Sequence, residues 1–303
     1  MRRNTWLRPE KGNPLAARLL IWIALHLGYR ATSLLRWPVT LYYAAVYATV
    51  RRASWHYLHR LHEVGKRPRP HWGMVLAHVH AYSTNILDRI YLLSGRFPHG
   101  NITVSGQEVL LEAMQEGTGC IIMGAHIGSF DALRQFGLDS SACFRMLMYR
   151  RFVGATSRFI EALAPDFNAD IIELGQPHSM LTTLKALRNG EFVGILADRA
   201  HDDSRSIPVR FLGRDAPIPT GPFHLAMLTK APVILVSAIR QKNGTYHIAC
   251  RRLTDTLPAE TGSATSENEL LPHMQAYVRW MEELCLHHPY AWFNFFDFWE
   301  EGL

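Results

Sequence analysis

Short apolar stretches alternate with helical patterns over residues 109–239, and this alternation constrains the fold more than any other feature of the sequence. Strands are predicted at 120–124, 192–197 and 233–239, and helices at 109–115, 179–188 and 223–229. Short buried strands that alternate with helices are typical of a parallel sheet covered on both faces. We therefore predict an α/β fold with a mostly parallel central sheet flanked by helices.

Three further elements adjoin this alternating region. Residues 246–250 are predicted to pair with the strand before them, because Asn243-Gly244 is a dipeptide typical of tight hairpin turns. Residues 74–94 and 270–287 have the apolar spacing of helices. The sheet region is therefore expected to lie between two long helices in the sequence.

The first 70 residues differ from the rest of the chain in charge. They hold 13 of the 32 lysines and arginines but only two of the 26 acidic residues, so they carry a net charge of +11 against −5 for the remainder. This asymmetry indicates that one face of the protein meets an anionic surface, either phospholipid or nucleic acid. Nucleic acid is the weaker choice, because no helix-turn-helix, RNP or zinc-finger pattern accompanies the basic residues.

The basic residues near the N-terminus lie among apolar and aromatic side chains. Two or three helices are predicted over 15–62, with breaks near Gly28 and at Pro38. Helices of this composition either lie in the headgroup layer of a membrane or pack in a core with solvated arginines, and the sequence alone leaves both open. We predict two parts, an N-terminal amphipathic helical region over 1–70 and a second domain over 71–303.

Composition excludes several classes of protein. With 48% hydrophobic and 19% charged residues, the chain is too apolar for a disordered protein. Its uncharged apolar runs are shorter than the roughly 18–20 residues that cross a bilayer, or are interrupted by histidines, which argues against a polytopic membrane protein. The four cysteines are far apart and form no C-x-x-C pair, so we expect a reducing compartment and no disulfide framework.

Polar residues with catalytic potential gather where the strand at 120–124 ends. His126 follows the strand, Gly128 allows a tight turn, and Asp131 stands at the start of the next predicted helix. A strand–turn–helix junction can fold the Asp131 carboxylate back onto the imidazole, whose other nitrogen then takes a proton from a hydroxyl. Ligand sites of open α/β sheets lie at such strand ends. A histidine and an aspartate at this spacing also arise by chance, and a structural histidine is the commoner case.

Several other recognisable sites are missing from the sequence. There is no G-x-S-x-G elbow, P-loop, H-E-x-x-H or G-x-G-x-x-G motif. Ser129 lies near His126, so a serine hydrolase has to be considered, although this serine could equally cap the following helix. The repeated His56, His59 and His62 lack a convergent set of carboxylates or thiolates for a metal. We therefore expect neither a bound metal nor an organic cofactor.

The segment Gly124–Asp131 resembles the H-x4-D/E block of the lysophospholipid acyltransferase superfamily, and more narrowly that of the late acyltransferases of bacterial lipid A biosynthesis. Further blocks agree with that family in their order along the chain. They are Asn85-Ile-Leu-Asp-Arg89, Met148-Tyr-Arg150, Gly194-Ile-Leu-Ala-Asp-Arg199, Ile207-Pro-Val-Arg-Phe-Leu-Gly213, Thr220-Gly-Pro-Phe-His-Leu-Ala226, Lys230-Ala-Pro-Val233 and Tyr290-Ala-Trp-Phe293. The ordered set, which covers roughly residues 5–300, is more specific than any single block.

The resemblance implies an O-acyltransferase that moves a fatty acyl group from a thioester of acyl carrier protein or coenzyme A to a hydroxyl of a membrane lipid or glycolipid. His126 fits the general base and Asp131 its orienting partner. Arg150, Arg151 and Arg158 are candidates for a positive charge at the oxyanion, and Arg150 is favoured because it has the family's Tyr-Arg context. The other residues expected to contact substrate or shape the cleft are Gly128, Asp198, Arg199 and Gly221.

The chain departs from the family at its N-terminus, where a membrane-spanning or anchoring segment is usual. This stretch is interrupted by Arg18, His26, Arg30 and Arg36, which favours peripheral or monotopic attachment at the cytoplasmic face of a bacterial inner membrane. The acceptor lipid, the acyl chain length and the choice of donor stay open. Two other functions also stay open: a hydrolase of acyl esters or thioesters that uses the same His–Asp pair with water, and a non-catalytic membrane-binding protein. The presence of both His126 and Asp131 favours an enzyme.

Overall fold

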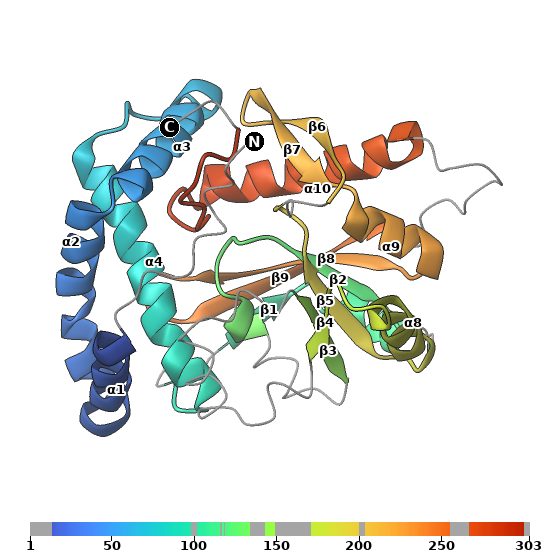
Figure 1. Cartoon of the computed structure of the whole chain (residues 1–303), viewed down its shortest axis with the longest axis horizontal. Helices are drawn as coiled ribbons and strands as arrows, with labels where there is room; N and C mark the ends of the chain where they lie inside the picture. Colours follow the sequence, from blue (N-terminus) through green and yellow to red (C-terminus); the bar gives the residue numbers. More distant parts are fainter. Residues whose placement is uncertain are drawn as a thin grey trace. The chain divides into compact units, whose positions relative to one another are not determined.

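The chain forms two compact units (Figure 1). The computed structural model describes residues 14–97, 102–115, 117, 119–133, 143–148, 171–199, 204–254 and 267–299. The first unit holds the described residues of Met1–Gly100 and Leu284–Leu303, and the second those of Asn101–Arg150 and Ala169–Glu283. In chain order the elements are α1 (Pro14–Leu34), α2 (Arg36–Val46), α3 (Ala48–Gly65), α4 (Trp72–Leu93), β1 (Ile102–Ser105), α5 (Glu108–Gln115), β2 (Ile121–Gly124), β3 (Phe144–Met148), β4 (Ile171–Glu173), α8 (Ser179–Arg188), β5 (Phe192–Leu196), β6 (Ser206–Phe211), β7 (Arg214–Pro219), α9 (Gly221–Thr229), β8 (Val233–Arg240), β9 (Tyr246–Thr254) and α10 (Glu267–His287).

The second unit is built on a seven-stranded sheet with the order β1-β9-β8-β2-β5-β3-β4. Neighbouring strands pair in parallel, except for β8 and β9, which form an antiparallel hairpin. The central strands β2, β5 and β8 are almost wholly buried, because they are continuous apolar stretches covered on both faces. Helix α5 packs on β9, and α8 packs on β4 and β5. The predicted α/β class, with a mostly parallel central sheet flanked by helices, is confirmed.

The strands that the sequence analysis missed are short, exposed or rich in proline. Strand β1 alternates between partly buried and exposed residues, and β4 has only three residues. The separate antiparallel hairpin of β6 and β7 contains Pro208 and Pro217 opposite each other. Proline lacks the backbone N–H that pairs strands, so sequence patterns argue against a strand at such positions. The predicted turn at Asn243-Gly244 is confirmed, with φ +90° at Gly244 between β8 and β9.

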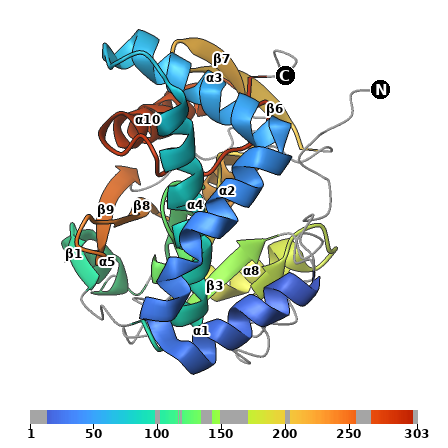
Figure 2. The same cartoon turned by 90° about the vertical axis from the view of Figure 1, so that its left-hand side faces the viewer.

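Helices α1 to α4 form the larger part of the first unit, and α2 packs along α4 (Figure 2). The break predicted near Gly28 is a kink inside α1, with φ 78° at this glycine. Pro38 lies in the first turn of α2, where its missing N–H has no intrahelical partner to lose. The sequence analysis put a boundary at residue 70, but α4 packs on α1, α2 and α3, so this unit continues through α4.

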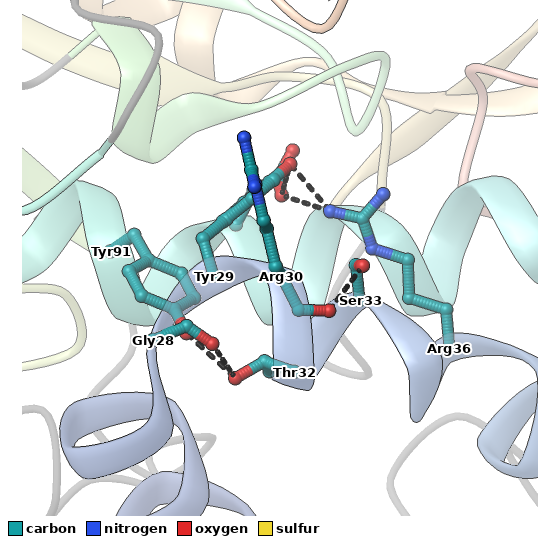
Figure 3. Close-up of polar contacts among 8 residues, drawn as sticks. Gly28, Tyr29, Arg30, Thr32, Ser33, Arg36 and Tyr91 are labelled. Atoms are coloured by element: carbon teal, nitrogen blue, oxygen red, sulfur yellow. Dashed lines mark hydrogen bonds and ion pairs between the residues drawn. The ribbon is translucent and has the colours of Figure 1, made fainter.

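A buried polar network fastens α1 and α2 to α4 (Figure 3). The Asp88 side chain of α4 is fully buried, and its Oδ1 accepts hydrogen bonds from the Tyr29 hydroxyl at 3.0 Å and from Arg36 Nη2 at 3.2 Å. Nearby, the hydroxyls of Thr32 and Tyr91 lie 2.7 Å apart. Breaking a buried ion pair by removing one partner costs about 3–5 kcal/mol, because a charge is left uncompensated. These contacts therefore hold α1 and α2 in one orientation on α4.

Candidate active site

His126 stands just beyond the carboxyl end of β2, close to the carboxyl end of β5 and beside the later residues of β8. The backbone turns sharply after it. Gly128 has φ +78°, and a Cβ at this position would lie 2.1 Å from the carbonyl oxygen of Ala238 in β8. The Ser129 N–H donates to the same oxygen at 2.8 Å. Only glycine fits so close to the neighbouring strand, so the main-chain geometry requires a glycine at position 128.

A short helical segment, 130–133, follows this turn. The Ala132 N–H donates to Ser129 Oγ at 3.3 Å, and Ser129 is only 1% exposed. The serine therefore acts as a helix cap and is shielded from substrate, which removes the support for a serine nucleophile. Asp131 lies in the first turn of the segment and is partly exposed.

The carboxylate that contacts His126 comes from the neighbouring strand and not from the same motif. Asp198 Oδ1 lies 2.7 Å from His126 Nδ1. The parallel register of β2 and β5 pairs Gly124 with Leu196, and His126 and Asp198 each follow two residues after these paired positions. The sequence analysis expected Asp131 at this nitrogen, and the structure has Asp198 there instead.

Charge sets the protonation of the pair. Burial alone would raise the pKa of Asp198, but His126, the hydrogen bond between them and the Arg199 guanidinium together lower it to about 2. The carboxylate is therefore ionised at neutral pH and only accepts hydrogen bonds, so His126 Nδ1 carries the proton. Withdrawal from water and the charge of Arg199 lower the pKa of His126, while Asp198 opposes them. The neutral ring, with an unprotonated Nε2, is thus the main form at pH 7.

The two members of the pair differ in their access to solvent. The His126 side chain is 32% exposed, whereas the Asp198 side chain is 0% exposed. A substrate can reach the imidazole, and water cannot compete for the carboxylate behind it. This arrangement suits a general base, in which one ring nitrogen is held by a carboxylate and the other accepts a proton from a bound hydroxyl.

The remaining predicted site residues have different surroundings. Arg199 acts electrostatically on both His126 and Asp198, so these three residues form one cluster. Gly221 is the first residue of α9 and has open space at its Cβ position. No hydrogen bond joins it to the pair within the part of the chain that the structure describes. Arg150 lies outside the described residues.

Sequence reasoning missed one residue that contacts this region. Tyr277 of α10 is 0% exposed, and its hydroxyl donates to the Gly124 carbonyl oxygen at 2.9 Å. No motif marks this tyrosine. Its position among the apolar residues of a predicted helix indicates that it is buried. A buried tyrosine hydroxyl normally finds a hydrogen-bond partner, so this pattern was the available signal.

No group of three or more His, Cys, Asp or Glu side chains among the described residues is arranged to hold a metal ion.

Comparisons with known proteins place this geometry in context. The family described as bacterial lipid A biosynthesis acyltransferase matches residues 93–300 of the chain. Among solved structures, the chain is similar to the 1-acyl-sn-glycerophosphate (LPA) acyltransferase PlsC from Thermotoga maritima, with 15% sequence identity and a TM-score of 0.37 over 84% of this chain and 96% of that one. No curated protein matches the chain. The family match covers more than half of the chain and includes His126, Asp198 and Arg199.

Proposed function

Because this chain belongs to the bacterial lipid A biosynthesis acyltransferase family, we propose that it transfers a fatty acyl group from a thioester of acyl carrier protein or coenzyme A to a hydroxyl of a membrane lipid or glycolipid. The family match confirms the resemblance seen in the sequence, and the protein is an acyltransferase of lipid biosynthesis. The observation that carries the finer proposal is the 2.7 Å contact between a buried Asp198 and a partly exposed His126. A base that is neutral near pH 7 can deprotonate a hydroxyl, and a thioester is already activated for attack.

In the proposed reaction the acceptor hydroxyl gives its proton to His126 Nε2 while its oxygen attacks the thioester carbonyl carbon. The imidazolium that forms is stabilised by the Asp198 carboxylate at Nδ1. The C–S bond then breaks, His126 returns the proton to the departing sulfur, and the products are an acylated lipid and a free thiol. No covalent acyl-enzyme is required.

The carbonyl oxygen becomes negative during this attack and needs a positive partner. Arg199 is our candidate among the described residues, because its charge already lowers the pKa of both His126 and Asp198. Arg150, which the family resemblance suggests, is the second candidate. One preorganised donor at an oxyanion is worth about 10²–10³ in rate.

Incubation with a labelled acyl thioester and inner-membrane lipid extract is expected to yield an acylated lipid and one free thiol per transfer. Mass spectrometry of the lipids should show an acceptor in which one hydroxyl hydrogen is replaced by the acyl group, and a reaction without protein gives the background. The hydrolase alternative predicts free fatty acid instead. Donor consumption that produces fatty acid and no acylated lipid would exclude the transferase.

We further propose that α1 and α2 bind the anionic lipid surface at the cytoplasmic face of the inner membrane. The two helices contain no Asp or Glu. Arg36 is paired with the buried Asp88, so Arg18 and Arg30 supply the charge that complements anionic headgroups. Among the described residues, no helix is both long and apolar enough to pass through a bilayer. The large apolar side chains that these helices expose are Leu19, Trp22, Leu27, Leu34, Trp37, Leu41, Tyr42 and Val46.

Replacing Leu27, Leu34 and Leu41 together by serine is expected to weaken binding to phosphatidylglycerol vesicles about tenfold or more, because apolar area that would enter the headgroup layer is lost. Cosedimentation at two salt concentrations measures this binding. The matched control replaces three leucines that are exposed to a similar degree in the second unit, Leu111, Leu181 and Leu228. Equal binding by the two triple variants would show that α1 and α2 are not the membrane-binding surface. Equal binding of the wild type to neutral and anionic vesicles at low salt would show that the charge asymmetry has nothing to do with lipid.

A further inference from the structure

The carbonyl oxygen of Gly124 joins three elements of the second unit. The Ala197 N–H donates to it at 3.0 Å, which continues the pairing of β5 with β2. The Tyr277 hydroxyl of α10 donates to it at 2.9 Å. A carbonyl oxygen has two lone pairs, and both are used here, one by the neighbouring strand and one by the helix.

This junction stands immediately before the His126–Asp198 pair. Gly124 precedes His126 by two residues, and Ala197 directly precedes Asp198. The paired register of β2 and β5 ends at Gly124 and Leu196. The Tyr277 hydroxyl therefore bonds at the position where the two strands stop pairing. The distance between the strands at this position determines how far apart His126 and Asp198 begin.

The surroundings of Tyr277 suit a fixed donor. Burial raises the pKa of Tyr277 well above its ordinary range, the charge of Asp198 adds to this, and a main-chain hydrogen bond at Ala197 opposes it. The hydroxyl therefore stays protonated, and it lies close enough to Asp198 to respond to its charge. The ring packs edge-on against Phe223, with 5.8 Å between centroids, so the ring position does not depend on the hydroxyl alone.

We propose that Tyr277 is a positioning residue for the His126–Asp198 pair, and that its hydroxyl holds the ends of β2 and β5 at the separation across which Asp198 reaches His126 Nδ1. The kinetic part of this inference rests on the proposed function. A displacement of about 1 Å at a catalytic group can cost on the order of 10²-fold in rate, so a hydroxyl that touches neither substrate nor imidazole still affects turnover.

The Tyr277→Phe variant is expected to keep the ring packing and to lower kcat about 10- to 100-fold, with the KM for the donor within about twofold. A second readout is the NMR resonance of the His126 Nδ1 proton, assigned with ¹⁵N-labelled histidine by its loss in a His126→Gln variant. This resonance should move upfield as the contact with Asp198 weakens. The matched control is Tyr91→Phe, which removes another buried hydroxyl that donates to a main-chain carbonyl, that of Ala24 at 2.9 Å.

Unchanged kcat together with an unshifted Nδ1 proton in Tyr277→Phe would overturn the proposal. Equal rate losses in Tyr277→Phe and Tyr91→Phe, with the Nδ1 proton unshifted, would also overturn it, because they indicate a loss of stability alone. If the wild-type protein transfers no acyl group to any lipid, the proposed function fails, and the NMR comparison of the two variants still decides the role of Tyr277.

Discussion

Replacing His126 by alanine is expected to lower acyl transfer about 10³-fold or more while leaving the fold intact. The imidazole supplies the base, and its pKa is lowered so that the ring is neutral near pH 7. The fold should survive because the side chain is 32% exposed, so its removal opens little buried space. The measurement is the rate of acylated lipid formation, with circular dichroism of the variant beside the wild type.

A matched control for this variant is His247→Ala in the same unit. His247 lies on β9 and its ring nitrogens are 3.0 Å from the hydroxyls of Thr103 and Ser105, so its ring is held by hydroxyl groups and not by a carboxylate. Its replacement should leave turnover near the wild-type value. In the wild type, kcat/KM should fall as pH drops through the lowered pKa of His126, because the protonated ring cannot accept a proton. Near-normal turnover of His126→Ala would end the general-base mechanism.

The central part of the fold could be predicted because its sequence signals are local. Strands β2, β5 and β8 are short continuous apolar runs, and buried parallel strands need no more than that. The outer strands β1, β3 and β4 lie at or near the two opposite edges of the sheet, where residues are partly exposed, and they lack such runs. Their pairing depends on neighbours that are distant in the sequence, and no local pattern reports it.

The candidate site divides in the same way. His126 could be found because a strand, the histidine and a glycine turn follow one another within a few residues. The sequence also marked Asp198 as a residue at a strand end, but local spacing favoured Asp131 as the partner of the histidine. The contact with Asp198 spans 72 positions and exists because β5 lies beside β2 in register. Strand order is a property of the folded sheet, and local patterns in a single sequence do not indicate which strands are neighbours.

The tight turn predicted at Gly128 is confirmed, and its predicted contact with substrate stays a prediction. The structure explains the glycine by its positive φ and by the main chain of Ala238, which leaves no room for a Cβ. A larger residue at 128 is therefore expected to disrupt the turn that carries His126.

The Asp198→Asn variant is expected to lose activity on the order of 10³- to 10⁴-fold, comparable with the loss of the base itself. An asparagine has nearly the same shape, but it is neutral and its amide can donate a hydrogen bond to Nδ1. A donor at Nδ1 favours the tautomer with its proton on Nε2, and that tautomer cannot accept a proton from the acceptor hydroxyl. The loss of charge should also lower the pKa of His126 further, because Asp198 is the group that raises it.

Asp131→Asn provides the matched comparison, since it makes the same chemical change five residues from His126 in the motif that the sequence alone would favour. Both variants are measured in one acyl-transfer assay, at one pH and with the same donor concentrations, after circular dichroism shows that each is folded. We expect Asp198→Asn to lose at least about 100-fold more activity than Asp131→Asn. A larger loss in Asp131→Asn, with Asp198→Asn close to the wild type, would contradict this assignment and make Asp131 the partner of His126.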